Sequence, residues 1–170
     1  MSIIKSISVL FVFFLTFFAQ AIKFIHTPIS DGFLYSEQKV SCYCDQTEVG
    51  FAYVVQCARY ICVIHSLYVY PDFRCRGYGG ALVKHLCSFL KKNGGKRIYI
   101  QPGPFELTDN GLYKEIDISS YEVNIQKLIV FYKKFGFNPV SNISSLCAKV
   151  LYGIVCIDEN ANYLMVKRVR

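Results

Sequence analysis

From position 39 onward, apolar and polar residues alternate along the chain as half-buried β-strands require. Two such runs, at 40–44 and 49–56, are separated by a short polar turn, and we predict that they pair as antiparallel strands. A third run at 60–70 is rich in β-branched and aromatic residues. It stops at Pro71, which has no N–H to donate to a sheet. The pattern therefore predicts three strands in succession.

The spacing of apolar residues then changes to that of a helix. Between residues 79 and 92, Leu82, Leu86 and Leu90 fall on one face, and the glycine pair at 94–95 is typical of a helix end. A strand is predicted at 97–101. The order so far favours a sheet with a helix packed on it.

The last third of the chain is less regular. Residues 105–118 form a polar insertion, and a second helix is predicted to begin near Ser119 and to end at Gly136. Short strands are predicted at 137–140 and 163–169, whereas 141–160 fits either a strand or a short helix. The order β-β-β-α-β-α-β-β predicts an α/β fold of the α+β kind, with a mixed sheet flanked by helices.

Residues 1–22 differ from the rest. Lys5 precedes an apolar run at 7–18, and an Ala-Gln-Ala tripeptide follows. A basic start, a short apolar core and small residues at the end predict a secretory signal peptide, or else a membrane anchor. The alternative is a buried first element. We therefore expect a domain at 23–170 and a secretory or membrane-anchored location, with a cytoplasmic location as the alternative.

Composition limits the function classes. The chain is 53% hydrophobic and 18% charged, which excludes a disordered protein. Its net charge of +7 suits an anionic ligand, but Lys and Arg are scattered, so we expect no nucleic-acid binding. The eight cysteines leave the redox compartment open. Cys42 and Cys44 share a strand face, yet no second pair follows at zinc spacing, so no metal site is predicted.

The segment 67–80 carries the clearest chemistry. A strand, a basic glycine-rich turn and a helix start follow one another, and exposed N–H groups at a helix start attract anions. Gly77, Gly79 and Gly80 carry no Cβ, so a ligand can approach the main chain closely. A dinucleotide-binding turn is the rival interpretation, and it fails because the third glycine and the later acidic residue are missing. We predict a site for a phosphate-bearing cofactor.

Two motifs resemble those of the GCN5-related N-acetyltransferase (GNAT) superfamily. The turn at 74–79 fits Gln/Arg-x-x-Gly-x-Gly/Ala and follows a Leu-x-Val strand end at 67–69. About fifty residues later, Phe131-Tyr132-Lys-Lys-Phe-Gly-Phe is similar to the family's second hallmark. The resemblance covers roughly residues 39–140. It implies a mostly antiparallel central sheet and transfer of an acetyl group from acetyl-CoA to a primary amine by direct attack in a ternary complex.

The resemblance also implies roles for particular residues. Tyr132 occupies the position of the general acid, and its alternative role is that of a core aromatic residue. His65 stands where relatives often have a glutamate and is the candidate base, with Ser66 and Glu106 as weaker candidates. The oxyanion donor is expected near Val69. The expected acetyl-CoA-binding residues are Leu67, Tyr68, Val69, Arg74, Cys75, Arg76, Gly77, Tyr78, Gly79, Gly80 and Asn124.

The chain departs from the family pattern in two places. The stretch between Ala21 and Val40 looks too short for the first strand and the paired helices that usually build the acceptor pocket, which makes 105–118 a candidate for acceptor contacts. The usual asparagine position is Ile125 here, with Asn124 one place away. Two other readings stay open: an inactive acyl-CoA-binding module, and a secreted or membrane-tethered interaction protein. The acceptor and the oligomeric state are not predicted.

Overall fold

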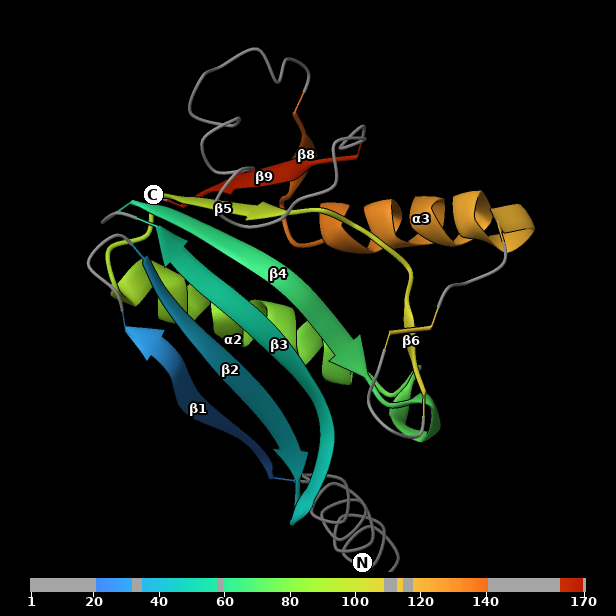
Figure 1. Cartoon of the computed structure of the whole chain (residues 1–170), viewed down its shortest axis with the longest axis horizontal. Helices are drawn as coiled ribbons and strands as arrows, with labels where there is room; N and C mark the ends of the chain where they lie inside the picture. Colours follow the sequence, from blue (N-terminus) through green and yellow to red (C-terminus); the bar gives the residue numbers. More distant parts are fainter. Residues whose placement is uncertain are drawn as a thin grey trace, which may run out of the picture.

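The computed structural model describes residues 21–31, 35–57, 60–108, 113–114, 118–140 and 163–169. In this part of the chain, a mixed sheet is packed against two helices (Figure 1). The predicted signal peptide or anchor, apart from its last two residues, and the segment 141–160 lie outside the described residues. No helix within the described ranges is long and apolar enough to cross a membrane.

Seven strands of the described chain form one sheet in the order β1-β2-β3-β4-β5-β9-β8. The β4–β5 pair is parallel and every other pair is antiparallel. The predicted α+β class with a mostly antiparallel mixed sheet is therefore confirmed. The strands are β1 (Ile22–Asp31), β2 (Tyr35–Cys44), β3 (Thr47–Cys57), β4 (Ile61–Val69), β5 (Arg97–Ile100), β8 (Asn138–Pro139) and β9 (Met165–Arg168).

The prediction that too little chain precedes Val40 for a first strand is wrong. β1 pairs with β2 from Ile22 opposite Cys44 to Asp31 opposite Ser36. The two strands form a hairpin, and a hairpin needs only a few residues to turn. Because only residues 32–34 separate the strands, this connection leaves no room for the paired helices. The N-terminal acceptor region therefore has its first strand, but the connection after this strand is too short to hold the paired helices.

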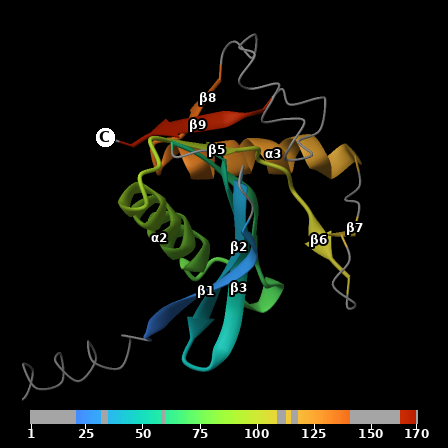
Figure 2. The same cartoon turned by 60° about the vertical axis from the view of Figure 1, so that its left-hand side comes forward.

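Helix α2 (Tyr78–Lys92) covers one face of the sheet (Figure 2). Its apolar residues recur at helical spacing, so they form one stripe that faces the strands. The opposing strand residues, among them Val40, Val54 and Ile64, are fully buried. The buried residues of α2 are Tyr78, Leu82, Val83, Leu86, Cys87 and Leu90.

The second helix, α3 (Ile118–Lys133), packs beside the start of α2. Phe131 and Phe135 of α3 lie within 4 Å of where a Cβ on Gly79 or Gly80 would be, so the missing side chains let the two helices approach closely. Residues 105–118, predicted to have little regular structure, contain the small antiparallel sheet β6 (Glu106–Leu107) and β7 (Tyr113–Lys114). A short 3-10 helix, η1 (Pro71–Phe73), connects β4 to the turn before α2.

Strand β4 contains a bulge where it pairs with β3. Tyr53 of β3 pairs with Ser66, and Val54 pairs with Ile64, so His65 is an extra residue without a partner on β3. An extra residue shifts the alternation of faces by one. Ile64 before the bulge and Leu67 after it therefore both pack into the core with α2. On its other side, β4 pairs with β5 only at residues 61–64. Residues 66–69 of β4 pair with β3 alone, so among the described strands they form an edge of the sheet.

A histidine pair connects β1 to α2. The Nδ1–H of His26 donates to Gln38 Oε1 at 3.0 Å, so its Nε2 can accept from His85 Nε2–H at 2.8 Å. The His85 ring stacks on Phe24, with centroids 3.9 Å apart. Burial, together with the neighbouring His26, lowers the pKa of His85 below its usual value. The pair therefore stabilises the edge strand when both rings are neutral.

This pair predicts a pH-dependent stability. Because the folded-state pKa of His85 is lowered, the unfolded chain takes up the proton more readily, and stability is lost as pH falls below about 6.5. The free energy of unfolding in urea should fall between pH 8 and pH 5 in the wild type and less so in His85→Phe. His65→Gln removes an exposed histidine of β4 that lies outside this pair and is the control for the loss of a histidine as such. Equal slopes for wild type and His85→Phe would contradict the assignment.

Candidate active site

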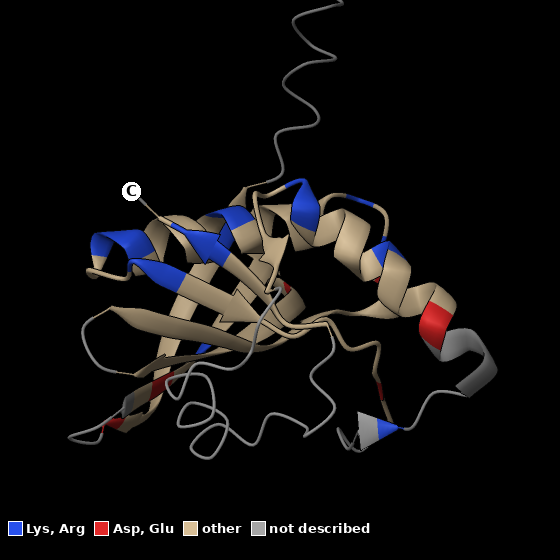
Figure 3. Ribbon diagram, turned by 90° about the horizontal axis from the view of Figure 1, so that it is seen from above, with Lys and Arg blue, Asp and Glu red and all other residues tan. Residues whose placement is uncertain are grey.

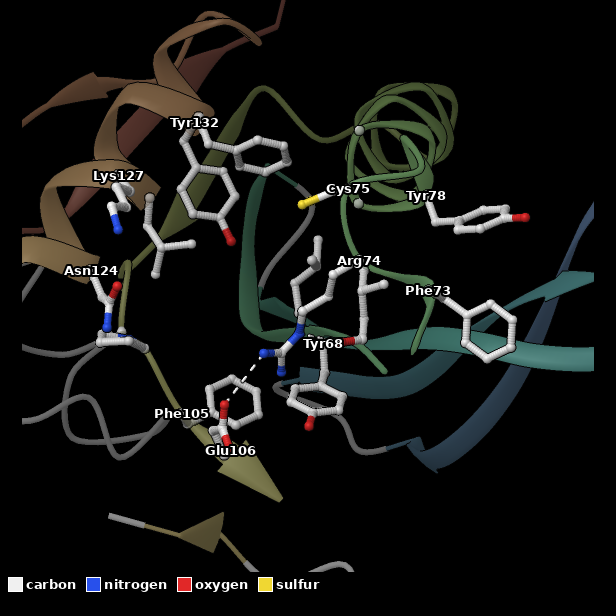
Figure 4. A pocket seen from close by; sticks show the side chains of 18 of the residues that line it. Tyr68, Phe73, Arg74, Cys75, Tyr78, Phe105, Glu106, Asn124, Lys127 and Tyr132 are labelled. Atoms are coloured by element: carbon white, nitrogen blue, oxygen red, sulfur yellow. Dashed lines mark hydrogen bonds and ion pairs between the residues drawn. The ribbon is translucent and has the colours of Figure 1, made fainter. Parts of the chain in front are cut away.

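A cavity of about 710 Å³ lies between the free end of β4, the start of α2 and the inner side of α3 (Figure 4). It arises because β4 and β5 diverge after the bulge while the glycine turn and α3 close the sides. Most of the predicted site residues line it. The lining residues are Leu67, Tyr68, Val69, Phe73, Arg74, Cys75, Gly77, Tyr78, Gly79, Gly80, Gly103, Pro104, Phe105, Glu106, Asn124, Lys127, Leu128, Phe131 and Tyr132.

The glycine turn forms one wall of the cavity. Gly77 has φ +88°, in the left-handed region that favours glycine, and it is the N-cap of α2. The first hydrogen bond of the helix runs from the N–H of Ala81 to the carbonyl of Gly77, so the N–H groups of Gly79 and Gly80 lie ahead of it. No acidic side chain occupies the first turn. The helix start therefore presents an uncompensated positive end, which suits an anionic group.

The end of β4 forms the second wall. β5 pairs with β4 only as far as Ile64, so no described strand lies beside residues 65–69 on that edge. A strand edge of this kind can hydrogen-bond an extended ligand through its main chain. At present the Val69 carbonyl accepts a hydrogen bond from Arg74 Nε at 3.1 Å. Binding of a ligand along the main chain of 67–69 stays a prediction.

Tyr132 comes from α3 and directs its hydroxyl into the cavity (Figure 4). The residue is only 5% exposed, and its ring packs edge-on against Phe131 and Phe137. Of the described residues, none hydrogen-bonds its hydroxyl, which therefore faces the cavity unpaired. Burial raises the pKa of Tyr132 well above its usual value of about 10. The phenol accordingly keeps its proton throughout the neutral range.

A cluster of two aromatic and two charged side chains forms the third wall. Arg74 Nη1 bonds Glu106 Oε1 at 3.3 Å, and the guanidinium lies over the Tyr68 ring, 5.4 Å from its centroid. Tyr68 in turn stacks on Phe105 with centroids 5.3 Å apart. This cluster joins the glycine turn and the end of β4 to the segment after β5.

Two polar residues of α3 complete the lining. Asn124 and Lys127 project toward the cavity from the same side as Tyr132 (Figure 4). Of these two, Asn124 is predicted from the sequence and Lys127 is not. The signal for Lys127 was its position three residues after Asn124, because residues three apart share a helix face. Phe105 also lines the cavity, and it begins the segment 105–118 that the sequence makes a candidate for acceptor contacts.

Three of the predicted site residues do not direct their polar groups into the cavity. His65 is exposed at the bulge and Arg76 is exposed in the turn, and neither lines the cavity. The Arg76 guanidinium lies over the ring of Phe73, 5.8 Å from its centroid. Tyr78 contributes to the lining, but its hydroxyl donates to Cys44 Sγ at 3.1 Å in the core. Tyr78 therefore anchors the helix start from within the core.

The described cysteines are free thiols, and only Cys75 is exposed. Burial raises the pKa of Cys42 and of Cys62 to about 11, so both behave as small apolar residues. Among the described residues, no group of three or more His, Cys, Asp or Glu side chains could hold a metal ion. Cys75 lines the cavity and has φ +61°, an uncommon conformation outside glycine.

Positive charge is spread over the molecule. Among the described residues, Lys and Arg occur on both helices and on the strands near the C-terminus (Figure 3). A nucleic-acid-binding face usually gathers such residues on one side. The absence of nucleic acid from the expected partners stays a prediction.

Gly77 provides a test of the turn. Its Cβ position is empty space in Gly77→Ala, so only the left-handed φ opposes the change. The substitution should lower the free energy of unfolding by about 1–2 kcal/mol, the usual cost of that conformation for an L-residue. Gly103→Ala is the matched control, because it also meets no atom within 4 Å and lacks the positive φ. Urea unfolding should leave Gly103→Ala nearly unchanged, and equal losses in both variants would refute the argument.

Comparison with known proteins agrees with this geometry. The family model for the acetyltransferase (GNAT) domain matches residues 36–139, which is more than half of the chain. This range runs from Ser36, the second residue of β2, to the end of β8, and it includes the glycine turn and Tyr132. No curated protein sequence matches the chain.

Solved structures of acetyltransferases share the fold at low sequence identity. A GNAT family acetyltransferase from Elizabethkingia anophelis, solved with acetyl-CoA bound, is 14% identical with a TM-score of 0.55 and matches 87% of this chain and 98% of its own. PaiA N-acetyltransferase from Thermoplasma acidophilum, in complex with coenzyme A, is 16% identical with a TM-score of 0.50 and matches 78% of this chain. The chain covers 61% of the PaiA chain.

Proposed function

Because the chain belongs to the GNAT family of acetyltransferases, we propose that it transfers an acetyl group from acetyl-CoA to a primary amine. The observation that carries this proposal is the convergence of three features on one cavity. They are the uncompensated helix start at Gly77–Gly80, the unpaired edge of β4, and the protonated phenol of Tyr132. Together they would hold the acetyl donor and supply a proton to its departing thiolate.

The walls fit coenzyme A part by part. Its pyrophosphate suits the N–H groups at the start of α2, where no acidic side chain competes. Its pantetheine arm suits the main chain of 67–69, which lacks a strand on that edge. Lys127 and Asn124 could add contacts from α3. Bound acetyl-CoA would supply the acetyl thioester.

We assign the general acid to Tyr132. The departing thiolate needs a proton, and a phenol, whose usual pKa is about 10, holds one at neutral pH. Burial raises the pKa of Tyr132 further, so the hydroxyl stays protonated until the thiolate forms beside it. The aromatic packing around the ring fixes its direction, so the hydroxyl is preorganised toward the cavity. For the amine proton we retain His65 as the proposed base. From its exposed place at the bulge, outside the cavity lining, it would act through water.

One observation favours a second function, that of an acyl-CoA-binding module without turnover. The tight β1–β2 connection leaves no room for helices that could enclose an acceptor. Such a module would keep the cofactor walls, and we propose it as the alternative. The location also stays a proposal: residues 1–22 would direct the chain to the secretory pathway or to a membrane, and a cytoplasmic protein is the alternative.

The first experiment addresses both functions. Calorimetric titration of the purified chain with acetyl-CoA should give saturable binding. Thiol release should then follow when alanine amide, lysine methyl ester or 1,4-diaminobutane is added. Binding without release for any of these amines would favour the module, and absence of binding at millimolar acetyl-CoA would contradict both proposals.

The role of Tyr132 is tested by removing its hydroxyl alone. Tyr132→Phe keeps the ring and its packing, so acetyl-CoA affinity should change little. Turnover with the best amine should fall by roughly 10²–10⁴, the usual range for general acid catalysis. Tyr99→Phe on β5, which does not line the cavity, is the control and should retain full turnover. Wild-type turnover in Tyr132→Phe would remove this residue from the mechanism.

A further inference from the structure

Glu106 is the one acidic side chain among the described residues that line the cavity. We propose that Glu106 is the carboxylate that receives a cationic amine acceptor, and that Arg74 covers it until coenzyme A phosphates draw the guanidinium away. This inference rests on the proposed acetyl transfer. It assigns the acceptor side to the β6 segment, which begins at Glu106 and follows β5.

The contacts of Arg74 reveal what the acceptor site offers. Its guanidinium binds the Glu106 carboxylate at 3.3 Å and lies over the face of Tyr68 at 5.4 Å. A carboxylate beside an aromatic face is the environment that stabilises an organic cation. The positively charged guanidinium of Arg74 thus occupies the place that the alkylammonium group of an acceptor would take. When the guanidinium leaves, both partners become available together.

The Arg74–Glu106 pair is weak enough to exchange. The two side chains are 41% and 48% exposed, and exposed ion pairs contribute little net stability. Arg74 belongs to the turn that leads into α2, so phosphates at the helix start would lie on its side of the cavity. A guanidinium matches phosphate oxygens in a two-pronged geometry, and a pyrophosphate carries more charge than one carboxylate. We therefore expect the guanidinium of Arg74 to bind the phosphates in preference to the Glu106 carboxylate.

Removal of the guanidinium from Glu106 also changes how the cavity acts on a positively charged acceptor. Arg74 and Lys127 both line the cavity, and with Glu106 already paired, the site would repel an incoming ammonium group. Pairing of Arg74 with phosphates leaves the Glu106 charge unbalanced beside Tyr68. The site then attracts a cation only after the cofactor is in place. Cofactor binding should accordingly precede acceptor binding.

Glu106→Gln tests both halves of the inference. Without the carboxylate, Arg74 keeps its hydrogen bond to the Val69 carbonyl and its place over Tyr68 but has no ion pair to give up, so calorimetry should show acetyl-CoA binding about 2–5-fold tighter than in the wild type. The KM for the best amine of the panel should rise about 10-fold, because a charge-assisted hydrogen bond to the ammonium group is lost. Glu122→Gln makes the same charge change on the exposed surface of α3 and should leave both values unchanged.

Arg74→Gln should move the two values in opposite directions from Glu106→Gln, with weaker acetyl-CoA binding and a lower amine KM. A merely structural role would instead weaken both ligands in both variants. Unchanged or weaker acetyl-CoA binding in Glu106→Gln, or an unchanged amine KM, overturns the inference while acetyl transfer by the wild type still stands. Failure of the wild type to acetylate any amine overturns the proposed function, and the inference falls with it.

Discussion

The site depends on one irregularity in the sheet, the extra residue His65 in β4. Without it, β4 would keep its alternation, and Leu67 would turn from the core with α2 toward the opposite face. The same irregularity coincides with the end of the β4–β5 pairing at Ile64. The inserted residue therefore keeps the strand attached to the core at the point where its edge is released by the end of β5. A released edge without this attachment would fray, since unpaired strand ends have few contacts to hold them.

Much of this fold follows from patterns of local origin. The strands at 40–44 and 49–56, the helix at 79–92 and the segment ended by Pro71 could all be predicted, because alternation, helical spacing and turn residues act over a few neighbouring positions. The strand β1 was missed because the stretch between Ala21 and Val40 looks too short for a first strand together with the paired helices. The hairpin after Asp31 carries an Asp-Gly pair, which is a turn signal that could have revealed it.

The candidate site divides in the same way. The glycine turn and Tyr132 were predictable from motifs, whereas the Arg74–Glu106 pair joins residues thirty-two positions apart and needs the three-dimensional path of the chain. Tyr78 shows that a motif residue need not face the ligand with its side chain. It falls within the motif, yet its hydroxyl bonds Cys44 in the core. A motif identifies the main chain that forms the turn, but the packing decides which side chains face the ligand.

The two halves of the site are held at a fixed separation by the contact between α2 and α3. Gly79 and Gly80 present no side chains, so Phe131 and Phe135 lie directly against the first turn of α2. Tyr132 is the neighbour of Phe131 on the same helix, and its position therefore follows from this contact. A bulky residue in the first turn would move the phenol as well as obstruct the anion site. The glycines thus serve packing and binding at once, because the wall that attracts phosphate is also the surface that positions the acid.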